Sequence, residues 1–294
     1  MEEFLHKLGL ITEVKKNEPM ARHTTFKIGG PAKYFVEADS VKTVKEALMA
    51  AREYSVKSYV IGNGSNLLVS DFGIDGLVIM MGNKFSEVRA DSEYIYAEAG
   101  AKLSKIAKCA LAHSLTGFEF AAGIPGSIGG AVYMNAGAYG GEMANIIAES
   151  TAIDEDFSEI TVTEHDFGYR KSIYKDSGKV ITGAKIRLTT GDGENIRETM
   201  ESLAARRREK QPLELPSAGS VFKRPEGFYA GALIEGAGLK GETVGGAMVS
   251  EKHAGFIVNK GGATAEDVKK LIEIIKTKVY EKYRVLLDTE IKFI

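Results

Sequence analysis

The chain has no tryptophan, one cysteine and six prolines among its 294 residues. A lone cysteine, Cys109, cannot form an intramolecular disulfide, so the fold must be stable without one. No stretch approaches the roughly 20 consecutive apolar residues that cross a bilayer. The 38 basic and 40 acidic side chains give a formal net charge of −2, which is too small to attract nucleic acid or anionic membranes. These absences exclude disulfide-rich and membrane-spanning proteins, and they predict no nucleic-acid or membrane partner.

Signals for export and for metal binding are also missing. The opening sequence MEEFLHKLGL has no basic n-region, no long apolar core and no small-residue cleavage site, which argues against a secretory signal. We therefore expect a cytoplasmic protein. His253 has no His or Cys at the spacing of metal ligands, and we expect no metal site anywhere in the chain. Nothing in the sequence indicates an obligate protein partner.

What the chain does contain is an ordinary globular composition with many glycines. Hydrophobic residues make up 44% and charged residues 27%, and there are 33 glycines. This length favours two domains, or two with a smaller third. Short apolar runs around one amphipathic helix between residues 33 and 98 form an α/β pattern. We expect further strands within residues 150–188 and a domain boundary near 190–200.

Four segments have the apolar spacing of helices. The first begins at Val41 with Ser40 as its N-cap, and the second runs from about Leu103 to His113. The third ends before Pro212. In the fourth, residues 264–283, Thr264 and Asp267 can form a capping box. Its predicted buried stripe consists of Val268, Leu271, Ile272, Ile275 and Val279.

The first candidate site is a short glycine loop after a predicted strand. Two glycines let the backbone turn tightly and expose successive N–H groups, while serine and asparagine add donors, which suits a pyrophosphate. The loop has neither the GxGxxG fingerprint nor the GK[ST] of a Walker loop. Taken alone, a plain turn explains it equally well. Its residues are Gly62, Asn63, Gly64, Ser65 and Asn66.

A second glycine-rich loop follows about 60 residues later. A single such loop is often only structural, but two in one α/β domain favour phosphate binding. Neither loop has the lysine expected at a γ-phosphate, so a dinucleotide with a buried pyrophosphate fits better than ATP. The residues are Gly123, Ile124, Pro125, Gly126, Ser127, Gly129 and Gly130, with Asn135, Ala136 and Gly137 after them.

Two polar segments are candidates for chemistry. Ser220 follows a glycine and precedes Lys223 and Arg224, but no GxSxG elbow surrounds it, so it is a proton donor or part of a plain turn. Arg170 follows Tyr169 in FGYRKS, and an arginine in such a segment is often only a surface residue. These alternatives stay open on the local sequence.

Taken together, the segments resemble the UDP-N-acetylenolpyruvoylglucosamine reductases, flavoenzymes of bacterial cell-wall precursor synthesis. The resemblance covers nearly the whole chain in the family's order: HTTFKIGGPA, IGNGSNLL, AGIPGSIGGAVYMNAGAYG, YRKS, PSAGSVFKRP, GGAMVSEKHAGFIVN and a C-terminal acidic residue. Each motif alone is weak, whereas their joint order is highly specific. The implied fold class is α+β. It combines α/β subdomains of the vanillyl-alcohol oxidase and p-cresol methylhydroxylase FAD-binding fold with a C-terminal α+β substrate-binding domain.

The resemblance also implies domains and cofactors. FAD-binding subdomain 1 would cover residues 1–80, completed by a C-terminal strand at 286–294. Subdomain 2 would cover 81–195, and the substrate-binding domain 196–285. The implied cofactor is FAD, with NADPH as co-substrate. Covalent flavin attachment commonly uses a histidine, and none of the five lies in the two glycine loops, so we expect the FAD to be non-covalent.

By motif, the two glycine loops and Asn135 to Gly137 match the family's FAD pyrophosphate cradle. Ser220 matches the proton donor, and Arg170 and Glu290 match the two other catalytic positions. The implied reaction is the NADPH-dependent reduction of UDP-N-acetylglucosamine enolpyruvate to UDP-N-acetylmuramate, which serves peptidoglycan synthesis and hence cell-wall biogenesis, cell shape and cell division. Positions that line the family's substrate pocket match Tyr169, Lys223, Arg224 and His253.

The chain resembles the shorter, second type of this enzyme. Only about ten residues separate Arg170 from the strand-like VITGAKIRL, so the sequence has no room there for a tyrosine-bearing loop that closes over the substrate. Two rival functions remain: an FAD-dependent oxidase of the same fold, and a non-catalytic sensor of flavin or nucleotide sugar. Intact Ser220, Arg170 and Glu290 count against a sensor.

Overall fold

The computed structural model of the chain describes residues 2–294. The chain divides into two compact units, and each is assembled from three separate stretches. The segments Met1–Lys15, Tyr34–Asn63 and Gly76–Arg207 make unit 1, and Lys16–Lys33, Gly64–Asp75 and Arg208–Ile294 make unit 2. The division into domains at 80, 195 and 285 stays a prediction.

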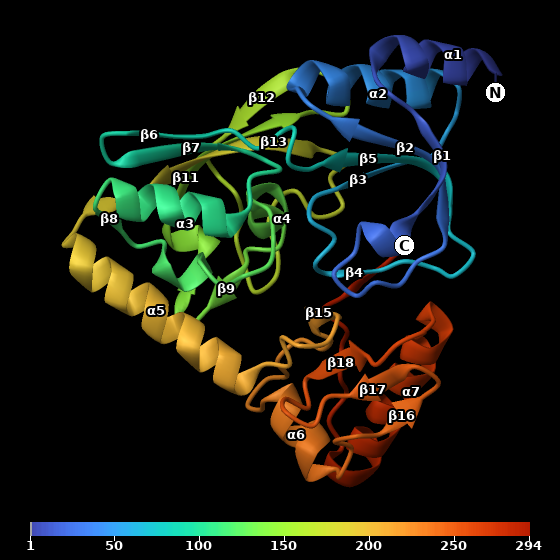
Figure 1. Cartoon of the computed structure of the whole chain (residues 1–294), viewed down its shortest axis with the longest axis vertical. Helices are drawn as coiled ribbons and strands as arrows, with labels where there is room; N and C mark the ends of the chain where they lie inside the picture. Colours follow the sequence, from blue (N-terminus) through green and yellow to red (C-terminus); the bar gives the residue numbers. More distant parts are fainter. Residues whose placement is uncertain (1) are drawn as a thin grey trace. The chain divides into compact units, whose positions relative to one another are not determined.

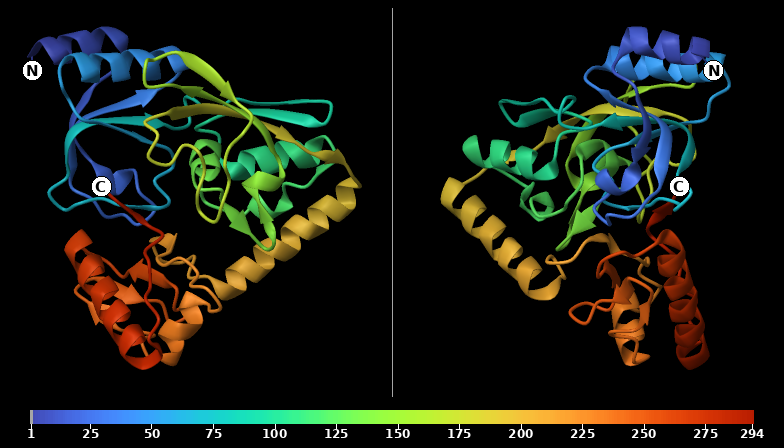
Figure 2. Two further views of the ribbon diagram at one scale, coloured as in Figure 1. Left: turned by 180° about the vertical axis from the view of Figure 1, so that it is seen from behind. Right: turned by 45° about the vertical axis from the view of Figure 1, so that its right-hand side comes forward.

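A four-stranded sheet with two helices occupies the first part of the chain. Ser40 accepts a hydrogen bond from the Thr43 N–H at 3.2 Å and begins α2, as predicted. The helices α1 and α2 lie side by side (Figures 1 and 2). In spatial order the strands are β1 (Lys15–Pro19), β2 (Pro31–Ala38), β5 (Ile74–Met81) and β3 (Ser58–Ile61), and the helices are α1 (Glu2–Ile11) and α2 (Val41–Glu53).

A five-stranded antiparallel sheet forms the second part of unit 1. Two helices, α3 and α4, pack against it (Figure 1). The strands in order are β12 (Glu159–Val162), β11 (Ile147–Ile153), β13 (Val180–Arg187), β7 (Tyr94–Glu98) and β6 (Val88–Asp91). The helices are α3 (Leu103–Ala112) and α4 (Ile128–Tyr133). Shorter pairs are β8 (Leu115–Thr116) with β14 (Thr189–Thr190), and β9 (Gly137–Ala138) with β10 (Gly141–Glu142).

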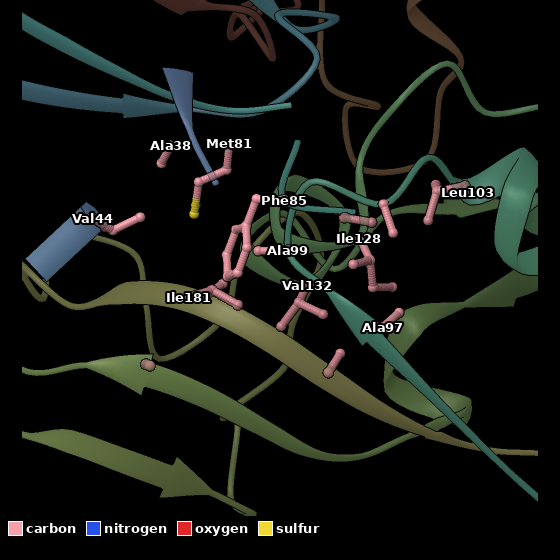
Figure 3. Close-up of a cluster of buried hydrophobic side chains, with 14 of the residues drawn as sticks. Ala38, Val44, Met81, Phe85, Ala97, Ala99, Leu103, Ile128, Val132 and Ile181 are labelled. Atoms are coloured by element: carbon pink, nitrogen blue, oxygen red, sulfur yellow. The ribbon is translucent and has the colours of Figure 1, made fainter. Parts of the chain in front are cut away.

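One hydrophobic core fills unit 1 and draws on both sheets. Figure 3 shows the Phe85 ring among Met81, Ala99 and Ile181. Phe85 is 1% exposed, and removing such a ring typically costs about 3 to 5 kcal/mol. The core therefore fixes the backbone that leads into the glycine loops.

Unit 2 contains another four-stranded sheet with a core of its own. The stripe predicted on α7 is fully buried, and the capping box of Thr264 with Asp267 forms, so both predictions are confirmed. The Asp71 carboxylate also accepts from the Ala265 and Glu266 N–H groups, which ties the start of α7 to a distant loop. The elements are β15 (Ser217–Ser220), β18 (Phe256–Asn259), β17 (Ala247–Val249), β16 (Thr243–Val244), α6 (Ala230–Gly236) and α7 (Ala265–Tyr283).

A parallel pair joins two distant parts of unit 2. The strand β19 (Lys292–Phe293) lies beside β4 (Leu67–Leu68). Next to it, the Ile294 N–H donates to the Leu68 carbonyl, and the Ser70 N–H donates to the Ile294 carbonyl.

The remaining elements include one long helix and three single turns. The third predicted helix is α5 (Gly193–Lys210), which ends before Pro212 as expected. Within residues 2–294, no helix is long and apolar enough to cross a membrane. The single-turn 3-10 helices are η1 (Met20–Arg22), η2 (Glu119–Ala121) and η3 (Met143–Asn145).

Candidate functional site

Within unit 1, the start of the first glycine loop, Gly62 and Asn63, lies against the second glycine loop. The Asn63 side-chain amide donates to the Pro125 carbonyl at 2.7 Å. A Cβ placed on Gly62 would lie 2.1 Å from Ser127 Oγ, so a larger residue there would require the Ser127 side chain to move. The structure thus brings together loops about 60 residues apart in sequence.

In the second loop, some N–H groups donate to carbonyls elsewhere in unit 1, and one glycine is exposed to solvent. The N–H groups of Ile128 and Gly129 donate to the carbonyls of Ala101 and Ala99, both at 2.9 Å. The next residue, Gly130, is exposed, and the nearest atom to a Cβ placed there would be Ser127 Oγ at 3.7 Å. Neither loop contains an acidic residue. An open backbone in loops without acidic side chains suits the pyrophosphate of FAD, so the residues present fit this cofactor.

Asn135 connects the second loop to the turn that carries Arg170. Its side chain is 1% exposed and is occupied within the protein. The amide donates to the Gly168 carbonyl at 3.1 Å, and the side-chain oxygen accepts from the Ala144 N–H at 2.9 Å. The Asn135 N–H also has a partner, since it donates to the Val132 carbonyl at 3.2 Å. The FAD contact of Asn135 stays a prediction.

Arg170 lies at the tip of a tight turn and beside the segment 135–137. Gly168 and Lys171 exchange two backbone hydrogen bonds of 3.0 and 3.1 Å, and Arg170 has a φ of +54°. Its guanidinium nitrogens lie 3.5 Å from the Asn135 and Gly137 carbonyls. The guanidinium also lies over the Tyr169 ring, 5.1 Å from its centroid. The structure thus brings two sequence candidates, Arg170 and the 135–137 segment, into one place.

Ser220 owes its register in unit 2 to an irregular strand. Ser217 lies opposite Val258 and Ser220 opposite Phe256, so β15 contains one residue more than β18 over this span. The extra residue forms a β-bulge, and Gly219 within it has a φ of +76°, which favours glycine. The bulge gives Ser220 the register position that a regular strand would give to Gly219.

Glu290 lies on the segment beside Ser220. The Glu290 N–H donates to the Val221 carbonyl at 2.7 Å. The Asn66 side-chain amide donates to the Glu290 carbonyl at 3.2 Å. Unit 2 therefore brings together Ser220, Glu290 and the last residue of the first glycine loop. Arg170 belongs to unit 1.

Sequence reasoning missed two polar residues that support this region. Thr25 donates its hydroxyl to the Ser217 carbonyl at 2.7 Å, and the buried Asn259 donates to the Phe26 carbonyl at 3.1 Å. Both bonds hold the segment HTTFKIGG to the strands β15 and β18. Thr25 and Asn259 both lie in motifs of the family, HTTFKIGG and GGAMVSEKHAGFIVN, but no local pattern indicates their partners, which lie far along the chain.

The structure gives Lys223 and Arg224, two predicted substrate-pocket residues, definite neighbours. The Lys223 N–H donates to the Asp288 carbonyl at 2.9 Å. Arg224 donates from Nε to the Phe228 carbonyl at 3.3 Å, and its guanidinium lies 4.0 Å from the centroid of the Tyr229 ring. These residues thus follow Ser220 on one loop, and their role toward substrate stays a prediction.

Comparison with known proteins gives one consistent result. Residues 32–163 match the FAD binding domain, and residues 211–294 match the C-terminal domain of UDP-N-acetylenolpyruvoylglucosamine reductase. The reductase of Alkaliphilus oremlandii is 48% identical over 95% of this chain and 92% of its own length. That of Clostridium perfringens is also 48% identical, over 96% of this chain and 93% of its own. The chain belongs to the UDP-N-acetylenolpyruvoylglucosamine reductase family.

Solved structures agree with membership of the reductase family. The crystal structure of the Thermus caldophilus reductase has a TM-score of 0.80 and 34% identity, and it covers 96% of this chain and 98% of that chain. The structure of wild-type Phl p 4.0202, a glucose dehydrogenase, has a TM-score of 0.52 at 13% identity and covers 65% of this chain and 44% of that chain. The latter likeness concerns the fold alone. The predicted fold class is confirmed.

His253, in a motif of the reductase family, is held as a neutral ring. Its Nδ1 accepts from the Gly255 N–H at 3.1 Å, and the ring meets Phe256 edge-on at 5.0 Å. Burial lowers the pKa of His253 below its ordinary 6.5, a hydrogen bond to its own backbone opposes this, and the charges of Lys240 and Glu235 have smaller, opposite effects. Neutral His253 is therefore part of the folded state.

This pKa predicts a loss of stability in acid. Unfolded His253 takes up a proton near pH 6.5 and the folded ring only at lower pH, so the free energy of unfolding should fall as pH drops below 6.5. His253→Gln can still accept a hydrogen bond but does not titrate. Urea unfolding at a series of pH values should show a shallower decline for this variant. Equal declines would refute the assignment.

Proposed function

We propose that this chain reduces UDP-N-acetylglucosamine enolpyruvate to UDP-N-acetylmuramate with NADPH, using bound FAD. The proposal rests mainly on family membership across nearly the whole chain, at 48% identity. The local arrangement agrees with it, since the Glu290 N–H donates to the carbonyl of Val221, the residue after Ser220. The reaction belongs to peptidoglycan precursor synthesis. We place it in the cytoplasm and connect it with cell shape and division.

The chemistry explains why these residue types are needed. When bound, FAD would supply the redox chemistry by which a hydride from NADPH reaches the methylene carbon of the enolpyruvyl ether. Negative charge then develops on the neighbouring carbon and spreads into the carboxylate. Arg170 would bind that carboxylate and stabilise the charge, and Glu290 would orient it. Ser220 would then donate its hydroxyl proton to the carbon.

The cofactor site is proposed at the converging glycine loops. The backbone of Gly62 to Asn66 and of Gly123 to Gly130 would hold the pyrophosphate, because these loops offer N–H groups without acidic side chains. Lys223 and Arg224 are cations suited to the substrate's diphosphate. Tyr169 and His253 remain further candidates for lining the substrate pocket.

Two spectra test the proposed function against its rivals. Purified protein should be yellow, NADPH should bleach the flavin absorbance, and the enolpyruvyl substrate should restore it without oxygen. An oxidase would recover its colour with oxygen and not with the enolpyruvyl substrate. A sensor would bind ligand without either change. Failure of the enolpyruvyl substrate to restore colour would refute the reductase.

A matched pair of variants at Gly130 tests the cofactor site. Space around Gly130 allows a side chain, and Asp and Asn have nearly the same size. Gly130→Asp adds a negative charge beside the proposed pyrophosphate and should weaken FAD binding at least about tenfold more than Gly130→Asn. FAD titration of the apoprotein measures both. Equal affinities would place the pyrophosphate elsewhere.

A further inference from the structure

A loop of unit 1 carries Arg170 and has buried polar side chains at both of its ends. The loop covers residues 163–179 and joins β12 to β13. His165 near its start is 5% exposed, and Tyr174 near its end is 1% exposed. Both side chains reach the hydroxyl of Ser150 in β11, which is fully buried. The proposed reaction uses none of these three residues.

The three side chains form a complete hydrogen-bonded network. Ser150 Oγ lies 2.7 Å from His165 Nε2 and 2.6 Å from the Tyr174 hydroxyl. Burial lowers the pKa of His165, with a smaller opposing effect from its hydrogen bond to the Thr163 backbone, so the ring is neutral. A ring that donates to the Thr163 backbone leaves Nε2 as an acceptor. Ser150 then donates to His165, and Tyr174 donates to Ser150, so each hydroxyl proton has an acceptor.

The network closes the base of the Arg170 loop. The Ile173 N–H donates to the His165 carbonyl at 2.6 Å, and the His165 ring stacks on Phe167 with centroids 4.8 Å apart. Between these closed ends, the Ser172 hydroxyl donates to the Tyr133 carbonyl of α4 at 2.8 Å. The short segment 166–173 is therefore held at both ends, and Arg170 lies at its tip.

The Arg170 turn needs this support because its backbone is strained. A non-glycine residue held at a φ of +54° has a strained backbone, and this conformation persists only where surrounding contacts enforce it. Ser150 is too deeply buried to touch a substrate, which excludes a nucleophilic role for the Ser150 and His165 pair.

We propose that Ser150, His165 and Tyr174 are positioning residues that hold the Arg170 turn in its reactive conformation. The inference rests on the proposed function of Arg170. It differs from that function because it assigns the arginine's placement to a buried network and not to the substrate.

Tyr174→Phe tests the proposal with little risk to folding, since it keeps the buried ring and removes only the hydroxyl. Recovery of flavin colour by the enolpyruvyl substrate should slow on the order of tenfold, because small misplacements of a substrate-binding group have effects of this size or larger. Bleaching by NADPH should stay within about twofold of the original rate, because it does not require Arg170. Tyr34→Phe, which removes the hydroxyl of another buried tyrosine in unit 1, is the matched control and should leave both rates unchanged.

A double-variant cycle distinguishes positioning from general destabilisation. If the network acts through Arg170, Tyr174→Phe should have less than a twofold effect in an Arg170→Lys background. An equal effect in both backgrounds, or equal slowing of bleaching and recovery, would overturn the proposal.

Hydrogen exchange gives a readout that does not depend on activity. The Gly168 and Lys171 amides, which close the turn, should exchange on the order of tenfold faster in Tyr174→Phe and at the original rate in Tyr34→Phe. Unchanged exchange in Tyr174→Phe would overturn the proposal. If the original protein failed to use the enolpyruvyl substrate while exchange still rose in Tyr174→Phe, the proposed function would fall and the role of the network in holding the turn would stand.

Discussion

Ser220→Ala should slow the recovery of flavin colour by the enolpyruvyl substrate by about 10² to 10⁴, the usual loss when a positioned acid is removed. Bleaching by NADPH should proceed near its original rate, because that step creates no carbanion on a bound enolpyruvyl group. Ser220→Cys should restore part of the rate, because a thiol can donate a proton from nearly the same place. Rapid mixing of the protein first with NADPH and then with the enolpyruvyl substrate, followed by flavin absorbance, measures the two rates separately.

Ser217→Ala is the matched control for this prediction. Ser217 lies on the same strand as Ser220. Its backbone carbonyl accepts a hydrogen bond from the Thr25 hydroxyl, and alanine retains this carbonyl. Its substitution should leave both steps within about twofold. Equal slowing of both steps by Ser220→Ala would mean that Ser220 supports the loop and is not the acid.

Arg170→Ala should also act on the second step, with a loss of about 10² to 10³, because it removes the cation proposed to stabilise developing charge. Arg170→Lys should recover little, because an ammonium cannot bind a carboxylate through two parallel hydrogen bonds. The same rapid-mixing measurement applies to both variants. A full recovery by lysine would show that charge alone is required.

Lys171→Ala controls for the loss of a positive charge in the same turn. Lys171 pairs with Asp166 at 2.8 Å on the surface, where such pairs contribute at most about 1 kcal/mol. Lys171→Ala should leave the recovery of flavin colour by the enolpyruvyl substrate nearly unchanged. A loss as large as that of Arg170→Ala would indicate a general electrostatic effect of the turn.

Capping residues in the sequence predict the helices α2 and α7 correctly, whereas the sequence does not predict the glycine-rich helix α4. Ser40 at α2 and the Thr264 box at α7 have partners three residues away, so the sequence contains the whole motif. The helix α4 was expected as a loop, because its glycines hide the apolar spacing of Ile128 and Val132, which are both fully buried. Burial of these two side chains in the core therefore stabilises α4, although its glycines disfavour a helix.

The candidate site was predictable as motifs and not as geometry. Family resemblance located Ser220, Arg170 and Glu290 along the chain. It could not reveal that Asn66 donates to the Glu290 carbonyl, since these residues are 224 positions apart. The bulge at Gly219 likewise depends on the register with β18, which no local pattern specifies. Local sequence patterns do not specify such long-range pairings, which become visible only in the folded structure.

The pairing of β4 with β19 has a consequence for how the protein is made. A ribosome adds 5 to 20 residues per second, so roughly 10 to 45 s pass between synthesis of Leu67 and of the segment that pairs with it. During that interval the core cluster that contains Phe26, Ile28 and Leu68, all buried in the finished protein, lacks Ile291. Nascent chains of this reductase therefore expose apolar surface for many seconds, and a chaperone that binds this surface would protect them from aggregation. For the same reason we expect refolding from denaturant to be slow.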